Sequence, residues 1–302
     1  MRVLVVGAGA LGAYYGSLLS KAGHHVHFIA RGNNLVALQS KGIRIVSDID
    51  GFELNHVEVS ERVPDSFLPD IALVTVKNYD LENALEICHR IGENAAILTL
   101  QNGLWAHEAA AHSFPDNLIL PGLTYATLTL EDPGVVRQCG GKPLIQFGSN
   151  NGITEKVNFF AVAFKESGIN TQVSENIHLN LWEKFSFICA LSSVTSAFQS
   201  SIGSIRDNQL QWNSFCEAMK ESVGVARIYQ PDLPNDLLHI HLEKAKKLAY
   251  TSRSSMLDDL LKGRKIELPW LSEDLILRAK KVNFLTPMTL SLVKSIRESN
   301  VA

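Results

Sequence analysis

Short apolar runs alternate with helical spacing along the first half of the chain. Four of these runs are rich in β-branched residues, as expected for strands buried on both faces of a parallel sheet. They are Arg2–Val6, Val26–Ala30, Ile71–Val76 and Ala95–Leu100. Between them, apolar positions recur with the 3.6-residue period of helices. These helices are expected over 14–22, 81–91 and 104–113. The alternation of strand and helix predicts a doubly wound, mostly parallel sheet.

Turn sequences add further strands to this sheet. Asp132-Pro133-Gly134 separates two long runs, Ile119–Leu130 and Val135–Phe147. Asp50-Gly51 similarly predicts a hairpin between Ile43–Ser47 and Phe52–Val59.

The pattern becomes helical beyond about residue 150. A helix over 153–168 and a short strand at Thr171–Val173 are followed by five segments with helical apolar spacing. These are Leu179–Phe198, Asn208–Tyr229, Asn235–Tyr250, Ser272–Lys281 and Thr286–Ile296, with Pro287 suited to the first turn of the last. We therefore predict an α/β fold with an N-terminal Rossmann domain, residues 1–174, and an all-α C-terminal domain, residues 175–302.

A glycine motif stands where the first strand meets the first helix. It fits G-x-G-x-x-G and consists of Gly7, Ala8, Gly9, Ala10, Leu11 and Gly12. In such a motif the first glycine permits the turn, the second lets a pyrophosphate approach, and the third lets helix and strand pack closely. The amides that open the helix would then face the phosphates. We interpret these residues as a dinucleotide site.

The end of the second strand indicates which dinucleotide binds. Sites for NAD usually place an acidic residue there for the ribose 2′-hydroxyl. This chain has Arg31 at that position, and no carboxylate occurs between Gly12 and Asp48. A cation suits a 2′-phosphate, so we predict NADP, although Arg31 taken alone also fits a solvated loop arginine.

Composition narrows the class of protein. The 28 basic and 31 acidic residues give a net charge of −3 without a basic stripe, which argues against nucleic-acid binding. The four cysteines form no C-x-x-C pair and suit isolated thiols in a reducing compartment. Met1 leads directly into a strand, and the apolar run Phe185–Phe198 is too short for a bilayer. We expect a cytoplasmic protein with no membrane partner.

Polar residues at later strand ends extend the candidate site. Ligands of open α/β sheets bind outside the carboxyl ends of the strands. Lys77 follows one strand, and Asn102 lies between Gln101 and Gly103 after another. In the second half, Lys184 interrupts an apolar helix. Desolvation there would lower its pKa and suit it to general-acid chemistry, but a helix lysine is more often a snorkelling surface residue.

Seven segments in order resemble the ketopantoate reductase (2-dehydropantoate 2-reductase) family. They are GAGALG at 7–12, Arg31, VTVKNYD at 74–80, QNG at 101–103, LWEKF at 181–185, SSML at 254–257 and GRKIE at 263–267. The resemblance implies NADPH-dependent reduction of a 2-oxo acid, with 2-dehydropantoate giving pantoate for pantothenate biosynthesis. It matches Lys184 to the proton donor and Glu267 to an active-site glutamate.

The resemblance also implies binding roles. It matches Asn102 to an asparagine that lies beside the lysine, the cofactor and the substrate. It also matches Ser255 to a serine that contacts the substrate carboxylate, and Lys77 to a lysine near the cofactor. The family usually has asparagines four and eight residues after the lysine, where this chain has Ile188 and Ser192, and Ile202 replaces a third. Ser192 is the residue we expect at the substrate in place of its asparagine.

These departures leave three hypotheses. The first is reduction of 2-dehydropantoate, and the second is the same chemistry on a more apolar 2-oxo acid, because isoleucine and amide lining discriminate substrates differently. The third is a non-catalytic NADP-binding sensor. We predict no metal, because no histidine group has a third ligand at metal-site spacing. The apolar helices suit a core or an interface equally, which leaves a homodimer open.

Overall fold

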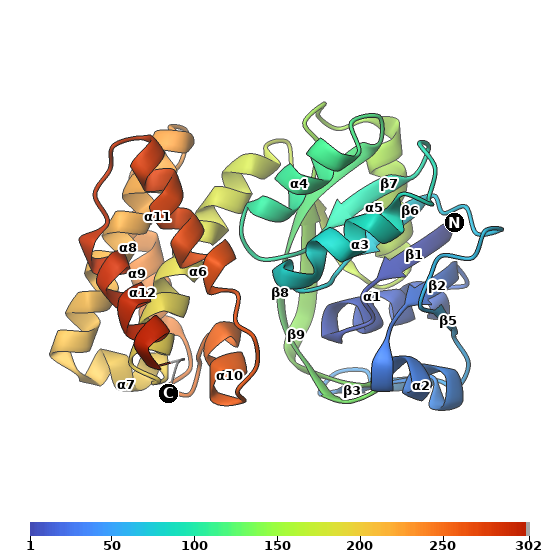
Figure 1. Ribbon diagram of the computed structural model, residues 1–302, viewed down its shortest axis with the longest axis horizontal. Coiled ribbons are helices and arrows are strands. Elements are labelled where there is room, and N and C mark those ends of the chain that lie inside the picture. Colours follow the sequence, from blue (N-terminus) through green and yellow to red (C-terminus); the bar gives the residue numbers. More distant parts are fainter. Residues whose placement is uncertain (300–302) are drawn as a thin grey trace. The chain divides into compact units, whose positions relative to one another are not determined.

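A computed structural model describes residues 1–299. The chain divides into two compact units. The first contains Met1–Gln101 and Trp105–Ile177, and the second contains Asn102–Leu104 together with the chain from His178 onward. The first unit contains the sheet and the second is helical, as the colours of Figure 1 make visible along the sequence. Every helix within residues 1–299 is too short or too polar to span a membrane.

A parallel sheet organises the first unit. Six strands lie in the order β5-β2-β1-β6-β7-β8, and all neighbours in this series run parallel. Their bounds are β1 Arg2–Val6, β2 His25–Ile29, β5 Glu58–Ser60, β6 Ile71–Val74, β7 Ala96–Thr99 and β8 Leu118–Asp132. The order reverses at β1, with β2 on one side and β6 on the other. Dinucleotides bind beside such a switch point.

A long hairpin extends the sheet beyond β8. β9 (Val135–Phe147) pairs antiparallel with β8, and β3 (Ile43–Ser47) pairs parallel with β9. β4 (Phe52–Leu54) closes that edge against β3, and β10 (Asn170–Val173) also pairs with β9. The predicted mostly parallel, doubly wound sheet is confirmed.

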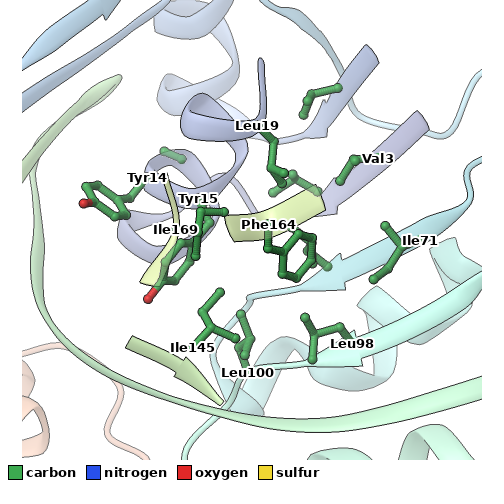
Figure 2. Close-up of a cluster of buried hydrophobic side chains, with 14 of the residues drawn as sticks. Val3, Tyr14, Tyr15, Leu19, Ile71, Leu98, Leu100, Ile145, Phe164 and Ile169 are labelled. Atoms are coloured by element: carbon green, nitrogen blue, oxygen red, sulfur yellow. The ribbon is translucent and has the colours of Figure 1, made fainter. Parts of the chain in front are cut away.

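Helices cover both faces of the sheet. Val3 and Val5 of β1 belong to one buried cluster and Leu4 and Val6 to the other, because successive strand residues point to opposite faces. Figure 2 shows the first cluster, in which Tyr15 and Leu19 lie near side chains of several strands. The helices of this unit are α1 Ala10–Lys21, α2 Gly32–Lys41, α3 Leu81–Cys88, α4 Trp105–Ser113 and α5 Glu155–Glu166.

The described part of the second unit is built from α-helices and one short 3₁₀ helix, η2. These are α6 Ile177–Ala197, α7 Ile202–Asp207, α8 Gln209–Tyr229, α9 Leu237–Lys247, α10 Ser255–Leu261, η2 Leu268–Trp270, α11 Ser272–Lys281 and α12 Pro287–Ser299. α8 packs against α7, α9, α11 and α12. The buried Glu221 of α8 accepts hydrogen bonds at the start of α12, from the Met288 amide (2.7 Å) and the Thr289 amide (2.8 Å).

One predicted strand needs correction, and two short helices were not predicted. The run Phe52–Val59 is not one strand: β4 ends at Leu54, and Glu58–Ser60 forms β5 against β2. Residues 55–57 between them carry the chain from β4 at one edge of the sheet to β5 at the other. The short helices α7 and α10 were not expected. Ser201 and Ser254 cap them, each accepting a hydrogen bond from a backbone amide of the first turn.

The prediction of isolated thiols agrees with the structure. All four thiols are free, and Cys88 and Cys189 are buried in the apolar interior. Burial raises the pKa of Cys88 to about 12, as expected for an inert packing residue.

Candidate cofactor site and active site

Of the three glycines in the loop after β1, the first and third are closely packed and the middle one is not. Gly7 has a φ of +100°, and a Cβ there would lie 2.5 Å from Val76 Cγ1. A Cβ on Gly12 would lie 2.2 Å from the carbonyl oxygen of Gly7. By contrast, a Cβ on Gly9 would meet no heavy atom within 4 Å. The loop therefore leaves open space where a phosphate would approach the backbone.

Hydrogen bonds from three directions hold this loop. The Gly7 and Ala8 amides donate to the Ile29 carbonyl oxygen, each at 3.1 Å. Thr75 Oγ1 donates to the Gly7 carbonyl oxygen (2.7 Å), and Asn34 Nδ2 donates to that of Ala8 (2.6 Å). The N-cap residue of α1 is Gly9, which has no side chain to cap the helix start. An uncapped helix start beside a fixed loop is suited to the phosphates of a dinucleotide.

Arg31 ends the segment after β2 and precedes the first residue of α2. Its side chain is 64% exposed, and its Nη2 lies 2.7 Å from Oδ1 of Asp80. Asp80 closes η1 (Asn78–Asp80), the short helix that follows β6 and Lys77. The structure therefore brings a carboxylate to Arg31 from another strand end. The rule that looks for an acidic residue about 20 positions after the glycines does not find Asp80, because that rule covers a single βαβ unit and Asp80 lies outside it.

Lys184 and Asn102 meet in the helical unit. Lys184 Nζ donates a hydrogen bond of 2.8 Å to Oδ1 of Asn102, across 82 positions of sequence. Asn102 is held in this unit by the neighbouring Gly103, whose φ is +95° and whose Cβ, if present, would lie 2.7 Å from the Trp270 carbonyl oxygen. Only a glycine permits that approach. The amide is thus positioned to orient the ammonium group.

The surroundings of Lys184 favour loss of its proton. Burial, then the positive charge of Lys244, lower the pKa of Lys184 to about 8, while Glu267 raises it. Glu267 is 5% exposed and directly precedes η2. An amine with a pKa near 8 exchanges a proton readily close to neutral pH, as a general acid requires.

Helix α9 brings Lys244 to this part of α6. His241 Nε2 donates to the Glu183 carbonyl oxygen (3.1 Å) and lies 3.0 Å from Ser186 Oγ. One turn later, Lys244 Nζ lies 4.6 Å from the centre of the Phe187 ring. Burial lowers the pKa of His241 to about 4, so the imidazole that joins α9 to α6 is neutral. Lys244 was not predicted from the sequence, because its effect on Lys184 depends on how α9 packs on α6.

The remaining predicted residues differ in how accessible they are. Ser255 is the first residue of α10 and is exposed. Ser192 is only 4% exposed, which leaves little surface for a substrate. Ile202 is completely buried and packs in the helical core, whereas Ile188 is partly exposed one turn after Lys184. Among the isoleucines that replace family asparagines, Ile188 is the one available to a ligand.

Comparison with known proteins matches both units. The family described as Ketopantoate reductase PanE/ApbA matches residues 3–152, and its C-terminal counterpart matches residues 176–300. The 2-dehydropantoate 2-reductase of Pyrococcus abyssi (strain GE5 / Orsay) is 30% identical over 296 residues, covering 97% of this chain and 95% of that protein. The chain belongs to the ketopantoate reductase family. It is therefore an oxidoreductase of the kind that acts on CH–OH groups.

Solved structures agree with this assignment. The ketopantoate reductase of Ralstonia eutropha JMP134 superposes with a TM-score of 0.90 at 25% identity, covering 99% of this chain and 98% of its own. A D-mandelate dehydrogenase solved with NADH and anilino(oxo)acetate has a TM-score of 0.89 at 21% identity, with coverages of 99% and 98%. The latter shows that the two share a fold. Ketopantoate reductases depend on NAD(P), and the family name connects them to pantothenate biosynthesis.

Proposed function

We propose that this protein reduces a 2-oxo acid to a 2-hydroxy acid with NADPH, and that the substrate is 2-dehydropantoate. The observation that carries the proposal is the hydrogen bond of 2.8 Å from Lys184 Nζ to Asn102 Oδ1, on a lysine whose pKa is about 8. Relatives named 2-dehydropantoate 2-reductase, at 30% and 28% identity, support the choice of substrate.

Residues of the first unit fit the cofactor. The open space over Gly9 and the uncapped start of α1 would receive the phosphates. Arg31 would bind the 2′-phosphate, and Lys77, after β6, would lie near the ribose. When bound, NADPH would supply the hydride for the carbonyl carbon. This fit is the support for NADP in this chain, because the fold is also found in a dehydrogenase solved with NADH.

Residues of the helical unit would donate the proton that the carbonyl oxygen receives. Lys184 stabilises the negative charge that develops on the carbonyl oxygen and donates its proton there. Asn102 accepts from the ammonium and directs its remaining N–H bonds, while Glu267 favours the charged form. The neutral amine is then reprotonated from solvent. Ser255 is proposed to contact the substrate carboxylate.

Steady-state kinetics with Lys184→Ala tests the mechanism. We expect turnover of 2-dehydropantoate to disappear while NADPH still binds in a fluorescence titration. Lys220→Ala is the control, because Lys220 is 67% exposed and pairs only weakly with Glu217 at 3.7 Å. Undiminished turnover in Lys184→Ala would refute the assigned proton donor.

A second candidate is an oxo acid without a hydroxyl group, favoured by the partly exposed Ile188. The matched probe is 3,3-dimethyl-2-oxobutanoate, which is 2-dehydropantoate without its hydroxyl. Preference for this analogue, reversed by Ile188→Asn, would establish the second candidate. Preference for 2-dehydropantoate would exclude it. NADPH binding with no oxidation by any 2-oxo acid would instead indicate a sensor.

A further inference from the structure

The guanidinium that is proposed to bind the 2′-phosphate already has an anionic partner. Arg31 Nη2 lies 2.7 Å from Asp80 Oδ1, and the two side chains are 64% and 33% exposed. Both groups are therefore accessible to a ligand. A phosphate that approaches Arg31 has to approach the Asp80 carboxylate as well.

The topology places this ion pair at the switch point of the sheet. β2 and β6 flank β1 on opposite sides, and both run parallel to it. Arg31 follows the carboxyl end of β2, and Asp80 follows that of β6. The pair therefore joins the strand ends on either side of the glycine loop, where the ribose of a dinucleotide is expected.

Asp80 does not use its carboxylate for its own helix. It occupies the N-cap position of α3, where aspartate commonly accepts a hydrogen bond from the first turn. Within residues 1–299, however, this N-cap has no side-chain hydrogen bond. An exposed ion pair contributes little to stability. Neither helix capping nor fold stability therefore explains why the carboxylate faces Arg31.

We propose that Asp80 is a cofactor-selectivity residue that weakens the preference for NADPH and allows NADH to be used. Its negative charge opposes the 2′-phosphate and occupies the guanidinium, whereas its oxygens can accept a hydrogen bond from a ribose 2′-hydroxyl. Repulsion between two unit charges about 4 Å apart in water changes a binding constant about fivefold. Asp80 also competes with the 2′-phosphate for Arg31. Together, the two effects should lower the ratio of kcat/KM for NADPH to kcat/KM for NADH about tenfold.

This inference rests on the proposed function, and the test is kinetic. The ratio of kcat/KM for NADPH to kcat/KM for NADH is measured in the wild type, Asp80→Asn and Asp80→Ser. Serine keeps an N-cap residue at α3, so agreement between the two variants excludes a local folding defect. We expect both variants to raise the ratio about tenfold.

Two further variants make the result specific. Asp65→Asn removes the carboxylate of a comparable exposed pair, in which Arg90 Nη1 lies 3.1 Å from Asp65 Oδ1, and should leave the ratio unchanged. Arg31→Ala should lower the ratio and reduce the effect of Asp80→Asn. An unchanged ratio in both Asp80 variants, or an equal change in Asp65→Asn, would overturn the inference.

Direct titration of each cofactor separates this inference from the proposed function. If the wild type binds neither NADPH nor NADH, the proposed function itself fails. If Arg31→Ala weakens NADPH binding while the Asp80 variants bind both cofactors as the wild type does, the cofactor site stands and only the role of Asp80 is refuted.

Discussion

The activity should decrease above about pH 8, because the proposed proton donor loses its charge there. Burial and the positive charge of Lys244 lower the pKa of Lys184 from 10.5 to about 8. A general acid must be protonated to donate. The rate of oxo-acid reduction should therefore fall as the pH rises through the pKa of Lys184.

The size of the decrease follows from that pKa. One unit above a pKa of about 8, about one tenth of the lysine is protonated, whereas a lysine with the ordinary value of 10.5 remains almost fully charged. We expect about a tenfold loss in kcat/KM at about pH 9 and a hundredfold loss at about pH 10. Oxidation of the 2-hydroxy acid needs the neutral amine as a base, so its rate should rise over the same range.

Replacement of Lys244 tests the cause of the low pKa. Lys244→Met removes a like charge, so the pKa of Lys184 should rise and the decrease should move to higher pH. Burial is the larger cause, so we expect a displacement of about one pH unit, which corresponds to about 1.4 kcal/mol. Lys244→Arg keeps the charge and should retain the wild-type profile.

The assay follows NADPH oxidation by absorbance across about pH 6 to 10, under conditions where the chemical step limits the rate. Lys247→Met is the control, because Lys247 lies on the same helix and is exposed. A wild-type rate that is constant up to about pH 10 would contradict the role of Lys184. An equal displacement in Lys244→Met and Lys247→Met would contradict the role of Lys244.

Three more predictions concern folding and binding. Lys184→Met should raise the free energy of unfolding by about 3 kcal/mol at neutral pH in urea titrations. In the folded protein the pKa of Lys184 is lowered from 10.5 to about 8, so burying the charged lysine destabilises the folded state. This destabilisation is fully present below about pH 8 and disappears as the pH rises to 10.5. Glu221→Gln should lower the free energy of unfolding by about 2 kcal/mol, because the carboxylate caps α12, whereas the exposed Glu217→Gln should not. Gly9→Ala should fold normally but weaken NADPH binding in a titration, whereas Gly12→Ala should lower the thermal midpoint, because its Cβ would lie 2.2 Å from a carbonyl oxygen.

Elements marked by turn residues or by a clear period are predictable from local sequence, whereas the ten-residue helix α2 and the three-residue strand β5 were not predicted. The predicted bounds of β9 and α11, Val135–Phe147 and Ser272–Lys281, match the structure because turn residues or periodicity mark both ends. The three-residue β5 exists because β2 offers it a partner. Such a strand has too few residues to show a period, and its pairing depends on residues distant in sequence.

The candidate site shows the same limit. Asn102 was predicted from its place at a strand end, whereas Lys184 needed the ordered motifs, since a helix lysine taken alone is more often a snorkelling surface residue. Asp80 and Lys244 act through space on Arg31 and Lys184, and each belongs to a different element from its partner. Their influence depends on strand order and helix packing, which local patterns do not specify.

The segment Asn102–Leu104 has a practical consequence for protein engineering. It belongs to the helical unit, although Gln101 and Trp105 on either side belong to the sheet unit. A chimera that joins the N-terminal half of one family member to the C-terminal half of another would therefore combine an asparagine and a lysine of different origin. Recombination libraries for this family should carry these three residues with the helical half, so that Lys184 and its hydrogen-bond partner Asn102 come from the same parent.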